Sequence, residues 1–480
     1  MVIAIITAID GVITRLADIA DNPAIDYKRF VIVSSWLQTA FEIWLYQRQL
    51  QCYKRETPPA ELALHLPQDT FLKAQRYGRD KTRYALYNTL YDQLMGWGMI
   101  LTDFYPRTWA WTGKWMGILG LAEDQMASHL CREQDLGSDL WNQIFHSLLW
   151  ITAVSIFTTI PSIPWSLYHA FVLEEKHGFN KSTLKLWISD QLKTYGLLAF
   201  IGLPVLSAFL KIIDWAGKLF VPWLMLFMIS VQLVLQIVYP TFIQPLFNKL
   251  TPLPEGELRG LVEKLAGQLG FPLKHLYVID GSKRSGHSNA YFYGLPWSKH
   301  IVIYDTLMEK SSPAEVEAVL GHELGHWYFT HPTMLLIIAQ FHLLFTLTIF
   351  SIFFHNKSLF ASFGFDPRFA NSSPHPIIIG FMLFQLVINP LDTFVKFFLN
   401  AQTRKYEYQA DEFAVKLDKK DDLASALIKL HIDNLSSPHN DRLYSLYHHS
   451  HPTLPERLVA MDQFALTKPK GLDGVKRKEL

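Results

Sequence analysis

The chain has 480 residues, of which 50% are hydrophobic and only 18% are charged, and its mean hydropathy is +0.11. Soluble domains carry about 25% charged residues, so this composition favours a protein that is covered by lipid. The 44 Lys and Arg residues almost balance the 43 Asp and Glu residues, which excludes a dedicated nucleic-acid binder and a disordered chain. The two cysteines, Cys52 and Cys131, are too few for a disulfide framework and lack a metal-binding spacing.

Apolar segments long enough to cross a bilayer recur along the chain, after an N-terminal stretch that we interpret as amphipathic. Seven segments are predicted to span the membrane: 29–47, 84–106, 141–163, 191–213, 219–241, 333–354 and 376–399. The first two contain acidic or amide side chains and are the weakest of the set. The sequence therefore predicts a mainly α-helical, polytopic membrane protein.

Basic residues are concentrated in the connection after the first predicted span, which holds Arg48, Lys54, Arg55, Lys73, Arg76, Arg79, Lys81 and Arg83. Lysine and arginine near span ends are retained in the cytoplasm, so this connection is predicted to be cytoplasmic. With seven spans, the long segment 242–332 and the tail 400–480 then lie on the cytoplasmic side together. Four parts result: 1–241 with five spans, 242–332, 333–399 with two spans, and 400–480.

Polar side chains occur inside most of the predicted spans: Glu42, Asp92, His146, Gln232, Gln236, Gln340, His342, Gln385, Asn389 and Asp392. One interpretation is hydrogen bonding between packed helices. The alternative is a water-filled chamber inside the helices, because polar groups in a span face protein or water rather than lipid.

The segment 242–332 has a different pattern from the spans around it. Helical apolar spacing predicts a helix over 255–270, and three short β-branched and aromatic runs at 274–281, 288–294 and 300–305 predict a small sheet. Ser312 and Glu315 form a capping-box pattern with Pro313 at the first helical position, which predicts that another helix follows.

That helix carries His322, Glu323 and His326 in a His-Glu-x-x-His pattern. The spacing places both imidazoles on one face, one turn apart, where they can share one Zn²⁺ per chain. Glu323 lies beside them as the predicted general base, which takes a proton from the attacking water.

A catalytic zinc ion needs a third protein ligand, and we predict Glu407 in a strongly helical stretch just after the last span. Asp411, one turn later, is predicted to orient a ligand imidazole. His331 is too close along the chain and out of phase, and Pro332 stands where a metzincin would have its third histidine. An alternative third ligand is Asp392, as in site-2-type intramembrane metalloproteases. A second alternative is a seven-span metal-binding receptor or channel without enzymatic activity, although a water-activating glutamate has no use there.

Five blocks occur in order around the predicted spans: EEKHGFN (174–180), HSNAYFYG (287–294), HELGH (322–326), EYQAD (407–411) and SHPTLPERL (450–458). With them the sequence resembles the type I CAAX prenyl protease family over nearly the whole chain. The resemblance implies a barrel of seven transmembrane helices that encloses a chamber and is capped by a cytosolic α+β zincin metalloprotease domain. It also implies removal of the C-terminal tripeptide from farnesylated CAAX proteins, and in some relatives a second, upstream cut in a mating pheromone or in prelamin A.

The resemblance assigns His322, His326 and Glu407 as zinc ligands and Glu323 as general base. His451 matches a residue near the scissile carbonyl, and Arg457 matches a nearby partner of that residue. The expected partners are a prenylated protein substrate and membrane lipid, without nucleic acid.

The other blocks allow weaker predictions. Asn289, Ala290 and Tyr291 are predicted to lie on a strand that could bind the substrate backbone, provided that this strand is at an edge of the sheet. His177 and Asn180 receive no role. Lys476 and Lys478 near the C-terminus resemble a dilysine retrieval signal, which favours the endoplasmic reticulum, or the continuous inner nuclear membrane, with the active site on the cytosolic side.

Overall fold

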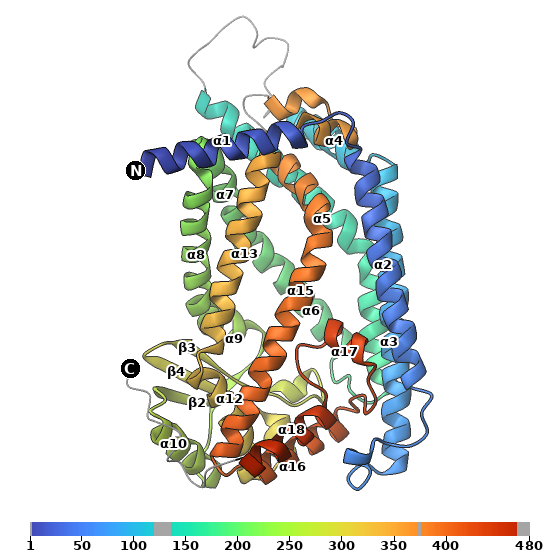
Figure 1. The fold of residues 1–480 in the computed structure, drawn as a ribbon, viewed down its shortest axis with the longest axis vertical. Helices are drawn as coiled ribbons and strands as arrows, with labels where there is room; N and C mark the ends of the chain where they lie inside the picture. Colours follow the sequence, from blue (N-terminus) through green and yellow to red (C-terminus); the bar gives the residue numbers. More distant parts are fainter. Residues whose placement is uncertain (1, 120–135, 372–375, 468–480) are drawn as a thin grey trace, which may run out of the picture.

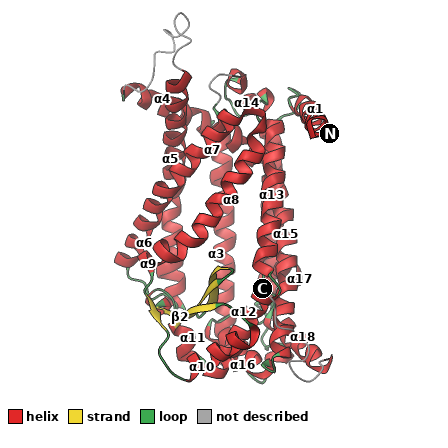
Figure 2. Cartoon of the chain, turned by 90° about the vertical axis from the view of Figure 1, so that its left-hand side faces the viewer, coloured by secondary structure: helices red, strands yellow, loops and turns green. Residues whose placement is uncertain are grey.

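The computed structural model describes residues 2–119, 136–371 and 376–467. The helices of the first half are α1 (Val2–Ala20), α2 (Tyr27–Cys52), α3 (Gln68–Leu101), α4 (Phe104–Ile118), α5 (Leu136–Tyr168), the π-helix η2 (His169–Glu174), α6 (Leu184–Leu197), α7 (Leu203–Ala216), α8 (Phe220–Val238) and α9 (Gln244–Phe247). Long helices run side by side along the long axis of the molecule, and α1 crosses one end of them (Figure 1, Figure 2).

The second half contains α10 (Glu257–Leu269), α11 (Asp305–Lys310), α12 (Pro313–Tyr328), α13 (His331–Phe353), α14 (Lys357–Ser362), α15 (Ile377–Lys416), α16 (Lys420–Asp433), α17 (Arg442–His448) and α18 (Leu454–Thr467). Its strands are β1 (Leu250–Pro252), β2 (Leu273–Ile279), β3 (Ala290–Leu295) and β4 (Ser298–Tyr304). These strands and the helices α10, α12, α16 and α18 gather at the end of the molecule opposite α1 (Figure 1).

Four helical stretches within the described residues are long and apolar enough to cross a membrane: 140–174, 184–247, 331–353 and 377–416. They cover the last five predicted spans to within one residue at either end, and the stretch 184–247 includes two of them. The protein is therefore a mainly helical membrane protein with several apolar helices and a small sheet. The first two predicted spans fall on α2 and α3, which do not reach this hydropathy because polar side chains interrupt them.

No single helix covers the second predicted span, 84–106. Helix α3 begins at Gln68, directly after Pro67, and ends at Leu101, because Asp103 adopts a left-handed conformation (φ 49°) and starts α4. No proline occurs between Gln68 and Leu101, and Gly78 lies inside the helix without ending it, so the basic residues of the predicted loop join the helix. Helix α3 thus carries basic side chains at one end and apolar ones at the other.

Hydrogen bonds between helices account for several of the polar residues in the predicted spans. Gln340 of α13 donates to Gln232 of α8 at 2.7 Å, and His146 of α5 lies 3.0 Å from the Thr112 hydroxyl of α4. Tyr447 donates to Glu42 at 2.9 Å. For these residues the structure favours helix packing over contact with water.

Other polar residues of the predicted spans are less enclosed by protein. His342 and Asp392 approach each other at 3.5 Å, and their side chains remain 35% and 50% exposed. Gln385 is exposed, and Asn389 lines a cavity of about 170 Å³ between α2, α3 and α15. These positions keep the chamber hypothesis open.

The sheet has the strand order β1-β2-β4-β3, with β2 and β4 parallel and the other pairs antiparallel. The three predicted strands are thus confirmed, and β1, which was not expected, extends the sheet on one side. Strand β3 lies at the other edge, where one side of its backbone is free of sheet partners. Helix α10 ends at Gly270, whose left-handed conformation (φ 70°) terminates the predicted helix.

Helix α15 is continuous over 40 residues, from the apolar segment to the charged block around Glu407. The predicted boundary at residue 399 falls inside it, whereas the divisions at 241 and 332 remain predictions that this structure does not test. One continuous helix, with Pro390 inside it, therefore links the apolar region to the functional site.

Candidate metal centre

The predicted helix start is present at the beginning of α12. The Ser312 hydroxyl accepts a hydrogen bond from the Glu315 backbone, and the Glu315 carboxylate accepts one from the Ser312 backbone at 2.8 Å. Val316, Leu320 and Leu324 on one face of α12 are buried against the sheet and α10. This packing fixes the opposite face, which carries His322 and His326.

Helix α15 crosses α12 closely at Gly325. A Cβ atom at this glycine would lie 3.1 Å from the Ala410 Cα and 3.2 Å from the Phe413 side chain. Small residues at both positions therefore let the two backbones approach. As a result Glu407, about one turn before Ala410 and only 2% exposed, reaches the two histidines.

The structure brings His322, His326 and Glu407 together. The Nε2 atoms of the two imidazoles are 3.2 Å apart, and each lies 3.3–3.4 Å from a carboxylate oxygen of Glu407. One ligand atom from each residue fits within a group whose members are all within 4.8 Å of one another. Two imidazoles and one carboxylate are the donor set of a catalytic zinc site with one open position, so these residues fit the metal.

Asp411 holds the outer face of His322. Its carboxylate lies 2.9 Å from His322 Nδ1 and is fully buried. Burial alone would lower the pKa of the His322 imidazole, but hydrogen bonds to Asp411 and Glu407 raise it to about 9. The surroundings thus favour positive charge at this point, which a metal cation would supply in place of a proton.

Arg457 is buried against Asp411. Its Nε and Nη2 atoms donate to the two carboxylate oxygens at 2.9 and 2.6 Å, and Nη1 lies 3.7 Å from Glu407. The family resemblance predicts Arg457 as a catalytic residue, a nearby partner of the residue matched by His451. In the structure it anchors the aspartate that orients His322.

His331, which the sequence excluded as a ligand, contacts the metal centre from behind. Its Nδ1 lies 3.0 Å from His326 Nδ1, and its Nε2 lies 3.0 Å from the Gln409 side chain. Thr330 makes this possible, because its left-handed conformation (φ 57°) turns the chain sharply between α12 and α13. His331 therefore orients His326 as Asp411 orients His322, and only the turn at Thr330 reveals this.

Glu323 and His451 face the centre from two elements. Burial raises the pKa of the Glu323 carboxyl, which suits a group that takes up a proton near neutral pH. His451 Nδ1 lies 2.8 Å from Glu407, and 62% of its side chain is exposed. Arg404 of α15 donates to the His451 carbonyl at 2.9 Å and pairs with Glu456, which holds the loop that presents His451.

The predicted substrate strand lies at the sheet edge beside α12. Ala290 and Tyr291 belong to β3 and pair with β4 on one side only, and the Asn289 carbonyl accepts a hydrogen bond from Tyr304 at 3.0 Å. Tyr291 also contacts Gln244. Strand β3 therefore lies at an edge of the sheet, which is the condition for binding a substrate peptide as an added strand.

The remaining predicted positions lie elsewhere. Asp392 pairs with His342 in the apolar region and does not belong to the described cluster around His322. His177 contacts Asp80 at 3.0 Å, and Asn180 contacts Glu175 at 2.9 Å, so both act in packing of a loop. Lys476, Lys478 and Cys131 are outside the described residues.

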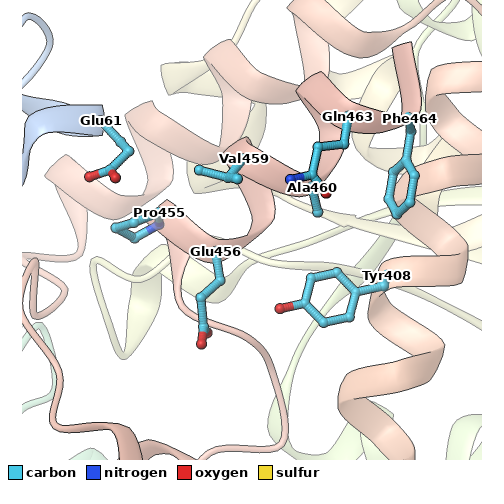
Figure 3. Close-up of a pocket in the computed structure, with 8 residues that line it drawn as sticks. All are labelled: Glu61, Tyr408, Pro455, Glu456, Val459, Ala460, Gln463 and Phe464. Carbon is cyan, nitrogen blue, oxygen red and sulfur yellow. The ribbon is translucent and has the colours of Figure 1, made fainter. Parts of the chain in front are cut away.

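A separate cavity of about 620 Å³ lies between α15, α18 and the segment around Glu61 (Figure 3). Tyr408 and Glu456 line it, together with apolar residues of α18. Its lining contains none of the residues predicted for the metal centre.

A His-Glu-x-x-His helix that receives a glutamate from a later helix, beside an edge strand, defines a metallopeptidase of the zincin class. Two family models match this chain. Residues 49–249 match the description "CAAX prenyl protease N-terminal, five membrane helices", and residues 252–465 match peptidase family M48.

Known proteins agree along nearly the full length. CAAX prenyl protease 1 of Saccharomyces cerevisiae is 39% identical over 458 residues, which cover 93% of this chain and 98% of the relative. The human CAAX prenyl protease 1 homolog is 37% identical, covering 90% and 94%. The crystal structure of S. mikatae Ste24p superposes with a TM-score of 0.81 at 40% identity and covers 92% of this chain and all of that one. The chain belongs to the CAAX prenyl protease 1 family of M48 peptidases, and it is a membrane-embedded metalloprotease.

Proposed function

We propose that this protein is a zinc endopeptidase of the endoplasmic reticulum membrane that removes the C-terminal tripeptide from farnesylated CAAX proteins. An upstream cut of the mating-pheromone or prelamin type belongs to the same active site. The observation that carries the proposal is the group of His322, His326 and Glu407, which lies where α13 and α15 leave the apolar region. A substrate with a lipid on its cysteine needs a peptidase at such a place.

The ligands assigned to one Zn²⁺ per chain are His322, His326 and Glu407, with Asp411 as the group that orients His322. A bound zinc ion would lower the pKa of a water molecule and polarise the scissile carbonyl. Glu323 takes the proton from the attacking water and passes it to the leaving amine. His451 donates a hydrogen bond to the oxygen on which negative charge develops.

The substrate backbone binds along the free edge of β3 at Asn289, Ala290 and Tyr291. An extended peptide added to a sheet edge gains main-chain hydrogen bonds whatever its side chains are, which suits an enzyme that accepts several CAAX sequences. The strand lies beside α12, so the bound peptide bond comes close to Glu323.

Seven spans enclose a chamber in this proposal, and the zincin part caps it on the cytosolic side. Helices α2 and α3 supply the first two spans, although they are less apolar than the others. They pack against each other, and α2 packs against α15, so that they extend the group of long helices (Figure 1). Thr39 of α2 donates to Gln93 of α3 at 3.1 Å, which satisfies polar groups that lipid could not.

The experiment that tests the proposed function uses the purified full chain and a farnesylated CAAX peptide. We expect release of the C-terminal tripeptide, detected by mass spectrometry, and loss of release with 1,10-phenanthroline. The isomer 1,7-phenanthroline does not chelate zinc and is the matched control. Cleavage that persists with the chelator, or that is equally fast without the farnesyl group, would contradict the proposal.

A further inference from the structure

A cavity of about 820 Å³ opens beside the metal centre. His451 and Arg457 line it on the side of the metal ligands, and its other walls come from α3, α16 and α17. Its lining includes Tyr77 and Lys81 of α3 and His448 of α17. Cavities of about 300–1,000 Å³ hold ligands of the size of a short peptide, so this one has room for three residues.

The charge of the cavity is one-sided. Among the described residues that line it, none is Asp or Glu, whereas Lys81 and Arg457 are cations. Arg457 is neutralised by its two bonds to Asp411. No described carboxylate lies within 4.0 Å of the Lys81 Nζ, although Glu174 interacts with it electrostatically from farther away. The Nζ lies 4.9 Å from the centre of the Tyr77 ring. The cavity thus offers one positive charge that is not held in a close ion pair.

The groups around the cavity include one carboxylate outside its lining. Glu174 on the adjacent η2 accepts a hydrogen bond from the Tyr77 hydroxyl at 2.8 Å and lies 3.6 Å from His287. Within the described part of the chain, the buried Nε2 atoms of His431 and His448 have no hydrogen-bond partner. Burial lowers the pKa of His448 to about 3, so at neutral pH this imidazole is uncharged and keeps one N–H to donate.

The direction of the substrate follows from the sheet edge. A peptide that pairs antiparallel to β3 has its C-terminal residues at the N-terminal end of the strand, near Ala290. His287, three residues before that end, lines the same cavity. Three extended residues reach about 10 Å, so the residues after the scissile bond would enter the cavity.

We propose that this cavity, the carboxylate pocket, holds the C-terminal tripeptide, and that Lys81 binds its free α-carboxylate. The inference rests on the proposed function and deepens it, because it explains how the enzyme measures three residues from the chain end. Lys81 is a specificity-determining residue in this scheme and takes no part in bond cleavage.

The test compares two farnesylated peptides that differ only at the C-terminus, one a free acid and the other a primary amide. We expect the wild-type enzyme to cut the acid with a kcat/KM about 10-fold higher or more, as one charge-assisted hydrogen bond allows. Lys81→Met keeps the side-chain length but removes the charge. It should lose most of this preference through slower cleavage of the acid, while cleavage of the amide changes less than about 2-fold.

Two further variants separate this effect from a change in folding. Lys73→Met alters another lysine of α3, one that is 62% exposed and outside the cavity, and should leave both rates unchanged. Lys81→Arg should retain a preference for the acid. As a second measurement, the free tripeptide should inhibit the wild-type enzyme more strongly than its amide, and this difference should vanish in Lys81→Met.

Each contrary result has its own meaning. Equal cleavage of acid and amide by the wild-type enzyme would overturn the carboxylate pocket while leaving the peptidase assignment intact. An equal loss for both peptides in Lys81→Met would also overturn it, because that result indicates a structural role. Failure of the wild-type enzyme to cut either farnesylated peptide would instead refute the proposed function, and the pocket with it.

Discussion

Glu323 stands between His322 and His326 in the sequence, but among the described residues only the two histidines join Glu407 in the group that could hold a metal. Glu323→Ala should therefore keep the metal and lose cleavage by about 10²–10⁴-fold, the usual cost of removing a general base. Elemental analysis and kcat on the same sample check both halves. Glu412→Ala on α15, which removes a carboxylate paired with Lys416, is the control and should keep near-normal activity.

The third ligand can be tested by neutralising each candidate carboxylate. Glu407→Gln should lower zinc occupancy well below one per chain, because it removes one of three ligands from a site that is preformed in the fold. Asp392→Asn should leave occupancy near one, since Asp392 pairs with His342 in the apolar region. The reverse pattern would move the protein to the class of intramembrane metalloproteases.

Sequence reasoning at the residue scale succeeds where a role depends on short spacing. The four-residue interval from His322 to His326 already specifies one shared helix face. Arg457 is 46 residues from Asp411, and no local pattern announces their pair. The helical spacing excludes His331 as a ligand, because this residue is out of phase with His322 and His326. It reaches His326 only because the left-handed conformation of Thr330 interrupts the helix.

At the scale of single elements, α12 depends on a buried carboxylate at its start. Glu315 is 5% exposed and accepts hydrogen bonds from Lys429 at 2.8 Å and Ser425 at 2.6 Å, both on α16, in addition to the Ser312 backbone. Burial alone would raise the pKa of Glu315, but these partners lower it to about 2. The carboxylate therefore ties α12 to α16 in its ionised form.

Glu315→Gln should lower the free energy of unfolding by about 1–3 kcal/mol at pH 7, the range for a buried charge-assisted hydrogen bond. Because the pKa in the folded state is below that in the unfolded state, this stabilisation is complete above pH 4.5 and is lost as the pH falls toward 2. Thermal unfolding of both proteins should thus converge in acid. Glu309→Gln, an exposed position on α11, should show no such difference.

Elements with strong local signals are predictable, and elements that depend on partners are less so. The capping box of α12 and the glycine that ends α10 are recognised from residues close together in the sequence. Strand β1 has only three residues and exists because it pairs with β2, so its sequence carries no strand pattern. Hydropathy does not predict the start of α3, because a charged helix and a charged loop have similar hydropathy.

At the scale of the whole molecule, hydropathy and charge predict a polytopic membrane protein with a soluble part at one end. In the structure the long helices run along the molecule, and the sheet lies at one end of them (Figure 2). The close approach of α12 and α15 at Gly325 connects the long helices to the end that carries the sheet. This contact could not be predicted from the sequence, because its residues are far apart in the chain.

The chamber remains to be tested, and helix α15 offers a contrast between its faces. The Asp392 side chain is 50% exposed, and Phe394 two residues later is 69% exposed. A polar group in a span is tolerated where it meets water or protein, whereas an exposed phenylalanine suits lipid. If the spans enclose water, Asp392 should face the chamber and Phe394 the bilayer.

Single cysteines at these two positions, in a chain whose Cys52 and Cys131 are replaced by alanine, should therefore react differently in vesicles. We expect a charged, water-soluble thiol reagent to label Asp392→Cys and to leave Phe394→Cys unlabelled. A second pair, Gln385→Cys and Leu233→Cys, repeats the contrast with an uncharged polar residue. Gln232 and Gln340 are poor probes, because they bond to each other. Protection of all four cysteines would refute the chamber without affecting the metal centre, whose ligands lie on α12 and the charged end of α15.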